Sequence, residues 1–230
     1  MAFGLETLTT GVFLIMASTL PGWCIPDQAP EINVIPKTEE VKYDFAKSSD
    51  QLGEFDIAHS PYEPGTPTIV KGLHSGKIKF STQFQIATRQ NPRNGRLCMY
   101  YHMVNVNFHI DPTIYISNDH MPGTCQHAAI HEHELKHLMT DRQVINDYSK
   151  WIGEAVHEDF VRNGYIWGPV YESQKEATIE DMKTSLNDVV RPLIQEMSED
   201  RHARQAAIDT IEEYERVAKA CGTHNHGYRR

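Results

Sequence analysis

The sequence predicts an α+β fold, in which an antiparallel β-hairpin sheet is followed by a helix with an HExxH motif and by a long helical C-terminal half. Three observations support this fold class. Apolar and polar residues alternate with a period of two through most of residues 77–116, as in strands with one buried face. Apolar residues then recur at i, i+3 and i+4 in residues 123–163 and again in residues 173–221, which is helical spacing. The strands precede the helices instead of alternating with them, and this order favours α+β over α/β.

Residues 1–24 are predicted to be a signal peptide. Residues 11–20 form an uncharged, mainly apolar run, which is shorter than the ~20 residues that span a bilayer. We therefore expect no stable membrane span. The ten residues before this run contain Glu6 and neither Lys nor Arg, so the positive region of a standard signal peptide is missing. The alternatives are a mis-assigned start codon and a buried N-terminal helix.

The four cysteines agree with export, because an even number of cysteines in an oxidising compartment usually forms disulfides. They are Cys24, Cys98, Cys125 and Cys221, and three pairings are open. A Cys98–Cys125 bridge would fix the motif helix against the sheet. No pair has CxxC spacing, which argues against a cysteine zinc site or a thioredoxin-like motif. We expect a secreted or periplasmic protein, with four reduced thiols in a cytosolic protein as the alternative.

The charge balance excludes some classes of partner. The formal net charge is −9, from 22 basic and 31 acidic residues. Nucleic acids and anionic membrane surfaces are bound by basic patches that neutralise phosphates, and here only Arg229 and Arg230 form a basic end. We therefore predict no nucleic-acid partner. With 40% hydrophobic residues in the chain, residues 25–230 are expected to form a single globular domain.

The first half of this domain is predicted to contain an irregular part and then the sheet. Residues 25–76 are rich in Pro, Gly, Asp and Ser, which are residues of turns. Two short strand-like pieces interrupt them, at 31–35 and 41–45. The sheet of residues 77–116 is predicted from a strand over Ile78–Ile86, a turn at Asn91–Gly95, a strand from Leu97 to Ile110 and its continuation through Thr113–Ile116.

The motif helix of residues 123–163 has two alternative courses. Thr140 and Gln143 form a capping box, so a new helix could start at that point. Alternatively, one helix continues to about Arg162, and Asn163-Gly164 ends it.

The C-terminal helices of residues 173–221 begin with a second capping box, formed by Ser173 and Glu176. Pro192 should kink or interrupt them, because proline lacks the N–H that a helix interior requires. Their apolar stripe is most simply explained by core packing.

His133, Glu134 and His137 form the HExxH motif. Residues four apart lie above one another on a helix, so both imidazoles can reach one metal ion. Zinc prefers four ligands, and in catalytic sites one of them is water. Zinc lowers the pKa of this water to about 7, and Glu134 is placed to take the proton as the general base.

The third protein ligand remains open at this point. If the chain turns after Thr140, Glu154 or Glu158 could return to the metal, and in a continuous helix Asp141 is the nearer candidate. Glu154 is ranked first, followed by Asp141 and His157. In a continuous helix, by contrast, Glu154 would lie about 25 Å beyond His137 at 1.5 Å per residue and would be excluded. Further options come from the sheet region, namely His102, His109 and His120.

These features resemble those of zincin-type metallopeptidases. More narrowly, a strand that begins near Cys98, a cysteine (Cys125) at the motif helix and the HELKH sequence at 133–137 resemble a bacterial family of predicted secreted Zn-dependent proteases. The resemblance implies that an edge strand above the helix holds the peptide substrate, and residues 96–116 are the candidate. Two longer zincin patterns are absent, since Gly153 replaces the Asn of one, and Thr140 and Gln143 replace the Gly and His of the other.

The predicted function is a secreted peptidase that cleaves peptide or protein substrates with Zn²⁺, His133 and His137 as metal ligands and Glu134 as base. Several tyrosines could stabilise the negative charge on the reacting carbonyl oxygen, and spacing selects none of Tyr100, Tyr101, Tyr148, Tyr165 and Tyr171. One alternative is a non-enzymatic envelope protein with a metal-binding, His-rich helix. Another is a di-iron helical site, for which Glu134/His137 and Glu154/His157 provide two Glu-x-x-His pairs.

Overall fold

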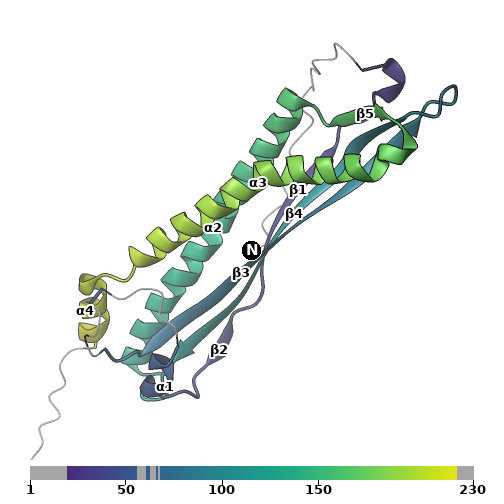
Figure 1. The fold of residues 1–230 in the computed structure, drawn as a ribbon. Coiled ribbons are helices and arrows are strands. Elements are labelled where there is room, and N and C mark those ends of the chain that lie inside the picture. The colour runs from purple at the N-terminus through teal and green to yellow at the C-terminus, as the bar shows by residue number, and fades with distance from the viewer. Residues whose placement is uncertain (1–19, 56–60, 63–65, 67, 222–230) are drawn as a thin grey trace, which may run out of the picture. The chain divides into compact units, whose positions relative to one another are not determined.

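The computed structural model describes residues 20–55, 61–62, 66 and 68–221. Figure 1 shows the elements, which in chain order are β1 (Glu31–Thr38), β2 (Lys42–Asp44), α1 (Ser49–Gly53), β3 (Gly72–Gln90), β4 (Leu97–Ile116), α2 (Cys125–Asn163), β5 (Ile166–Val170), α3 (Lys175–Ala206) and α4 (Ile211–Lys219). Short 3-10 helices lie at Gly22–Cys24 and Glu172–Gln174.

The chain divides into two compact units. Unit 1 comprises Met1–Pro36, Phe80–Phe108 and Asp147–Glu196, and unit 2 comprises Lys37–Lys79, His109–Asn146 and Met197–Arg230. Strands β3 and β4 and helices α2 and α3 each contribute residues to both units.

Unit 1 is built around the first half of β4. Strand β5 pairs with it antiparallel, with Leu97 opposite Val170. Tyr101 is buried; its hydroxyl donates a hydrogen bond to the backbone oxygen of Met182, and its ring stacks on Phe160 at 4.9 Å. These contacts join β4 to the parts of α2 and α3 that belong to this unit. The buried side chains from Val104 to Phe108 alternate with less buried ones, as the period of two predicts.

Unit 2 is built around the second half of β4 and the first half of α2. Strand β2 pairs with β4 in parallel, with Lys42 opposite Thr113 and Asp44 opposite Tyr115. The core of this unit combines one face of β4 with α2 and α4, and its buried members are Ile114, Ile116, Ala129, Ile130, Leu138 and Val217. This core holds the motif helix and α4 together.

The predicted antiparallel hairpin sheet is wrong, although the chain does combine one sheet with helices. The sheet has five strands, in the order β1–β4–β2, and β3 and β5 also pair with β4. Strand β2 runs parallel to β4. Strands β1 and β2 lie at the two strand-like pieces predicted within residues 25–76, which also contain α1 and the start of β3. Alternating hydrophobicity marks a strand but says nothing about its partner or direction, which here are set by residues about 70 positions apart.

The helices follow the longer of the two courses predicted for the motif region. Helix α2 continues without a break from Cys125 to Asn163, and Gly164 follows with a φ of +84°, the left-handed conformation that favours glycine after a helix. Pro192 lies inside α3 and does not interrupt it. Instead, the C-terminal helical region breaks between Ala206 and Ile211.

The disulfides join Cys24 to Cys98 and Cys125 to Cys221. Of the three pairings that the sequence left open, the one with a Cys98–Cys125 bridge does not form. Cys98 is the second residue of the 20-residue strand β4, whereas Cys125 begins α2, beyond the other end of that strand at Ile116. The actual bridge at Cys125 ties the start of α2 to the residue that closes the α4 region, within unit 2.

Most of the predicted signal peptide, residues 1–19, lies outside the described residues. The bridge at Cys24 requires this residue in the mature chain, so we expect any signal-peptide cleavage to fall before it. Among the helices that the structure describes, none is long and apolar enough to cross a membrane.

Candidate metal centre

The motif residues lie on the buried face of α2, within unit 2. His133, Glu134 and His137 are only 5%, 4% and 8% exposed. The two histidines are four residues apart, so their rings meet on one side of the helix with centroids 4.8 Å apart. Ionisable side chains are rarely so buried without a partner, which indicates that this face of the helix serves a site and not only the core.

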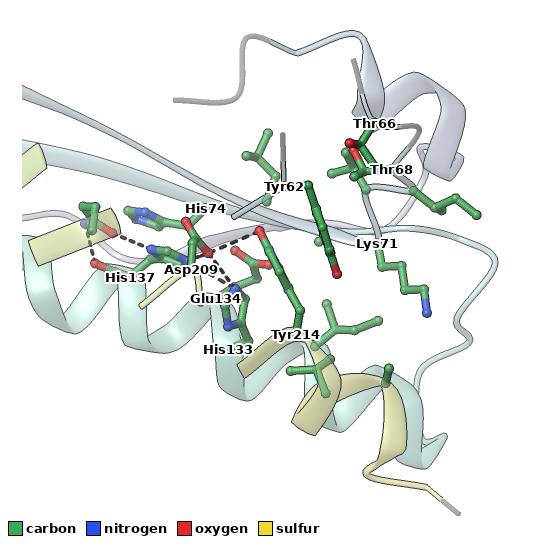
Figure 2. A pocket seen from close by; sticks show the side chains of 18 of the residues that line it. Tyr62, Thr66, Thr68, Lys71, His74, His133, Glu134, His137, Asp209 and Tyr214 are labelled. Carbon is green, nitrogen blue, oxygen red and sulfur yellow. Dashed lines mark hydrogen bonds and ion pairs between the residues drawn. The ribbon is translucent and has the colours of Figure 1, made fainter. Parts of the chain in front are cut away.

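A third group meets the two imidazoles. The Nε2 atoms of His133 and His137 lie 3.3 Å apart. Asp209 Oδ1 lies 3.2 Å from the first and 3.1 Å from the second (Figure 2). Asp209 is in the short connection between α3 and α4. His133, His137 and Asp209 are the one group in the described part of the chain whose ligand atoms are close enough to hold a metal ion.

These distances and donor atoms fit zinc. Zinc binds imidazole nitrogen at about 2.0 Å, and ligand atoms at tetrahedral angles around it are then about 3.3 Å from one another. The three separations in the group are 3.3, 3.2 and 3.1 Å. Two imidazoles and one carboxylate form one of the ligand sets of catalytic zinc sites, which leave a fourth position open.

The Nδ1 atoms of both imidazoles, which do not contact Asp209, have hydrogen-bond partners of their own. His133 Nδ1 lies 3.3 Å from Glu213 Oε1, and His137 Nδ1 contacts Gln205 Oε1. Both partners are acceptors, so the hydrogen-bond network places the ring protons on Nδ1. The two Nε2 lone pairs then converge with the Asp209 carboxylate and need a cation or an added proton between them. This convergence is the strongest sign of a metal site in the chain.

Glu213 also compensates charge around the centre. Its carboxylate accepts hydrogen bonds from Arg216 at 2.8 Å and from Lys136 at 2.7 Å. The hydrogen bond from Arg216, more than any other cause, holds the pKa of Glu213 below its usual range. In the metal-free protein burial raises the pKa of Asp209, but hydrogen bonds from the doubly protonated rings of His133 and His137 outweigh it and the net pKa is lowered. Both carboxylates are therefore ionised at neutral pH and favour a bound cation.

Glu134 is enclosed beside the ligands. Its carboxylate accepts a hydrogen bond from the backbone N–H of His74. A Cβ atom on Gly72 would lie 2.5 Å from Glu134 Oε1 and 2.4 Å from the Ile130 side chain, so only glycine allows β3 to pass this closely. Burial raises the pKa of Glu134 to about 7, against the opposing effect of the two histidines.

A cavity of about 770 Å³ adjoins the ligands and Glu134 (Figure 2). Tyr214 lines it, with its hydroxyl 3.3 Å from Asp209 Oδ1 and its ring 5.7 Å from that of His133. Burial raises the pKa of Tyr214, so its hydroxyl remains a donor through the neutral range. Other walls come from the segment before β3 and from α3 and α4, and they include Thr66, Thr68, Ile69, Val70, Lys71, Ser198, His202, Val217 and Ala218.

The other predicted ligands lie outside this group. Glu154 is exposed and pairs with Lys150 at 4.0 Å. The break after Thr140 that would allow Glu154 or His157 to return to the metal does not occur in α2. Asp141 is fully buried, but its oxygens are bound by Arg201 and Gln205.

Two further expectations change with the topology. The two Glu-x-x-His pairs of the di-iron alternative both lie on α2, whereas such a site needs them on two helices. Residues 96–116 were the expected substrate strand, but β4 is the central strand of the sheet and has partners on both sides. The backbone that contacts Glu134 belongs to the start of β3.

The remaining histidines and tyrosines of the sequence hypothesis serve elsewhere. His109 lies 3.6 Å from Glu39, and His127 Nδ1 lies 3.1 Å from the backbone oxygen of His120. The tyrosines that line the cavity are Tyr62 and Tyr214, and none of the five that spacing offered is among its lining residues.

Sequence reasoning missed Asp209, Gln205, Glu213 and Tyr214. One local signal was present, because Thr210 and Glu213 have the spacing of a helix N-cap. The structure has this cap, with the Thr210 side chain accepting from the Glu213 N–H. It places Asp209 in a loop directly before a helix, but no local pattern shows that this loop lies beside His133.

His74 gives a prediction about stability and pH. Burial, helped by His137 and Arg201 and opposed by Asp141, lowers the pKa of His74 to about 4. A lowered pKa means that the folded state resists protonation of His74. The contribution of the neutral His74 to the stability of the folded state is therefore present above pH ~6.5 and is lost as the pH falls towards 4. In the metal-free wild type, His74 should lower the free energy of unfolding by about 2 kcal/mol between pH 7 and pH 5. We expect this part of the decrease to be absent in His74→Gln.

Urea unfolding at the two pH values measures this difference. The same substitution at the exposed His102 is the control. An equal pH response of the wild type and His74→Gln would contradict the prediction.

The chain matches no protein-family model, no curated protein and no solved structure. The site is therefore interpreted from its own geometry.

Proposed function

We propose that this chain is an exported, zinc-dependent peptidase that hydrolyses peptide bonds. The observation that carries the proposal is the arrangement of the buried Glu134 beside the His133–His137–Asp209 group, at the wall of a cavity. A protein that only stores metal needs the three ligands but neither the buried acid nor the cavity. The two disulfides support export to an oxidising compartment.

The roles of the residues follow from their positions. His133, His137 and Asp209 would hold the ion, and zinc when bound supplies a Lewis acid that lowers the pKa of a water to about 7. Glu134 is adjacent to the first ligand and is held by the His74 N–H. Its carboxylate would take a proton from the attacking water and deliver it to the leaving amine nitrogen.

The cavity supports an extended peptide as substrate. Its volume of about 770 Å³ is within the range of sites that enclose several side chains. The segment from Thr68 to Leu73 forms one wall and includes the backbone that touches Glu134. Apolar lining near α4, from Val217 and Ala218, would accept an uncharged side chain of the substrate.

Tyr214 is expected to contribute to the rate of this reaction. Its hydroxyl, 3.3 Å from Asp209 Oδ1, lies at the edge of the ligand group and would donate to the oxygen of the reacting carbonyl. Loss of one such donor typically lowers kcat by about 100-fold or more. We expect Tyr214→Phe to lower kcat by about this factor with little change in KM and with zinc retained.

Steady-state kinetics and zinc content of the purified protein check this prediction. Tyr171→Phe is the matched control, because Tyr171 is 60% exposed and is not among the residues that line the cavity. Equal kcat values for Tyr214→Phe and the wild type would remove this role.

The direct test of the function uses the full chain with its disulfides formed. Elemental analysis should find about one zinc per chain, and the protein should cleave an unfolded substrate such as casein. Chelation should stop cleavage, and added zinc should restore it. A protein without stoichiometric metal, or cleavage that persists after complete removal of the metal, would contradict the proposal. Stoichiometric zinc without hydrolysis would instead favour a non-enzymatic metal-binding protein.

A further inference from the structure

A buried polar network lies behind His137, on the side away from the metal position. Gln205 is 6% exposed and contacts His137 twice. Its Oε1 accepts from His137 Nδ1, and its Nε2 donates to the backbone oxygen of His137 at 3.0 Å. Gln205 thus binds His137 at both its ring and its backbone.

The orientation of the Gln205 amide is fixed by Asp141. The second hydrogen of Gln205 Nε2 goes to Asp141 Oδ1 at 2.5 Å. Asp141 is fully buried and is held by Arg201, with Nε 2.7 Å from Oδ1 and a terminal nitrogen 2.9 Å from Oδ2. Arg201 in turn donates to the backbone oxygen of Gly76 at 2.9 Å. A flipped amide would turn its oxygen towards two acceptors, so the observed orientation is strongly preferred.

This orientation has a consequence for the ligand. An amide oxygen can only accept, so His137 must carry its ring proton on Nδ1 and present a bare Nε2. Outer partners of this kind orient metal-binding histidines, and their loss typically costs 10–100-fold in metal affinity. His133 has the Glu213 carboxylate in the same position, whereas His137 depends on a neutral amide.

We propose that Gln205 is a positioning residue for the metal centre: held by Asp141, it fixes the tautomer and ring orientation of His137 and thereby raises the affinity for the ion. This inference rests on the proposed metal site. It also explains why Asp141, one turn after His137 on α2, binds Arg201 and Gln205 and is not part of the ligand group.

The test compares two substitutions of Gln205 that differ in one property. Gln205→Met has a similar length and no acceptor, and we expect it to weaken zinc affinity by 10–100-fold. Gln205→Glu keeps an oxygen opposite His137 Nδ1, and its other oxygen, when protonated, still donates to Asp141 Oδ1. In this protonated form we expect an affinity within about threefold of the wild type. Zinc affinity is measured by competition with a chromogenic chelator, and the stability of the metal-free proteins by urea unfolding.

Two further variants separate positioning from a general loss of stability. Gln126→Leu removes another glutamine side chain of unit 2, which donates to the Val217 backbone oxygen at 3.1 Å and does not touch a ligand. It should leave zinc affinity unchanged. Asp141→Asn leaves Gln205 in place but allows its amide to flip, and it should therefore weaken zinc affinity. This variant provides the test if Gln205→Met does not fold.

The results have distinct meanings. Weak binding by Gln205→Met that Gln205→Glu restores, without a matching recovery of metal-free stability, supports the positioning role. Wild-type affinity in Gln205→Met, or equally weak binding in Gln205→Glu, overturns it. Absence of zinc binding in the wild type would overturn the proposed function itself, and so is distinguishable from failure of this inference.

Discussion

Glu134→Gln is expected to reduce peptide hydrolysis by at least about 100-fold while zinc remains bound, because general-base catalysis typically contributes 10²–10⁴-fold. The substitution keeps the size of a side chain that is 4% exposed. It also keeps an acceptor for the His74 N–H, which the carboxylate uses in the native protein. The amide, however, cannot take up a proton. Zinc content and the rate of substrate cleavage are measured on the same preparations.

The matched control is Glu132→Gln, two residues earlier on α2. Glu132 is 60% exposed in its side chain and forms surface ion pairs with Lys136 at 3.8 Å and Arg216 at 3.3 Å. Such pairs contribute little to stability, so this variant should hydrolyse at close to the wild-type rate. Wild-type activity in Glu134→Gln would exclude Glu134 as the base. Loss of zinc together with activity would assign it a structural role.

Asp209→Ala is expected to weaken zinc binding by more than the 10–100-fold that outer partners of a ligand contribute, because it removes one of the three proposed ligands. The two Nε2 atoms, 3.3 Å apart, would then lack the carboxylate that compensates the charge of the ion. Activity should fall with the bound metal and recover in part at high zinc concentration. Chelator competition and elemental analysis measure this effect.

Two controls make the assignment of Asp209 specific. Glu154→Ala tests the ligand that spacing along the chain favoured, and it should bind zinc as the wild type does because Glu154 is exposed and pairs with Lys150. Asp200→Ala removes an aspartate of α3 whose partner is Arg204 at 2.7 Å. Weak zinc binding in Glu154→Ala with normal binding in Asp209→Ala would reverse the assignment.

Features that depend on local periodicity can be predicted from the amino-acid sequence. The strand from Leu97 to Ile116 and a helix through the motif follow from alternation and from i, i+4 spacing. The continuous helix that ends at Asn163-Gly164 was one of two courses that the sequence allowed. The proximity of His133 and His137 also follows from sequence, since residues four apart on a helix are neighbours whatever the fold.

The contacts between distant segments could not be predicted in this way and are known from the folded structure. Asp209 lies 72 positions after His137, and Gln205 lies 68 positions after it. Neither belongs to a recognisable local motif. The parallel pairing of β2 with β4 and the Cys125–Cys221 bridge are likewise contacts between residues far apart in the chain. Such contacts depend on how buried faces pack against each other, and hydrophobic patterning specifies that a face is buried without specifying against which partner.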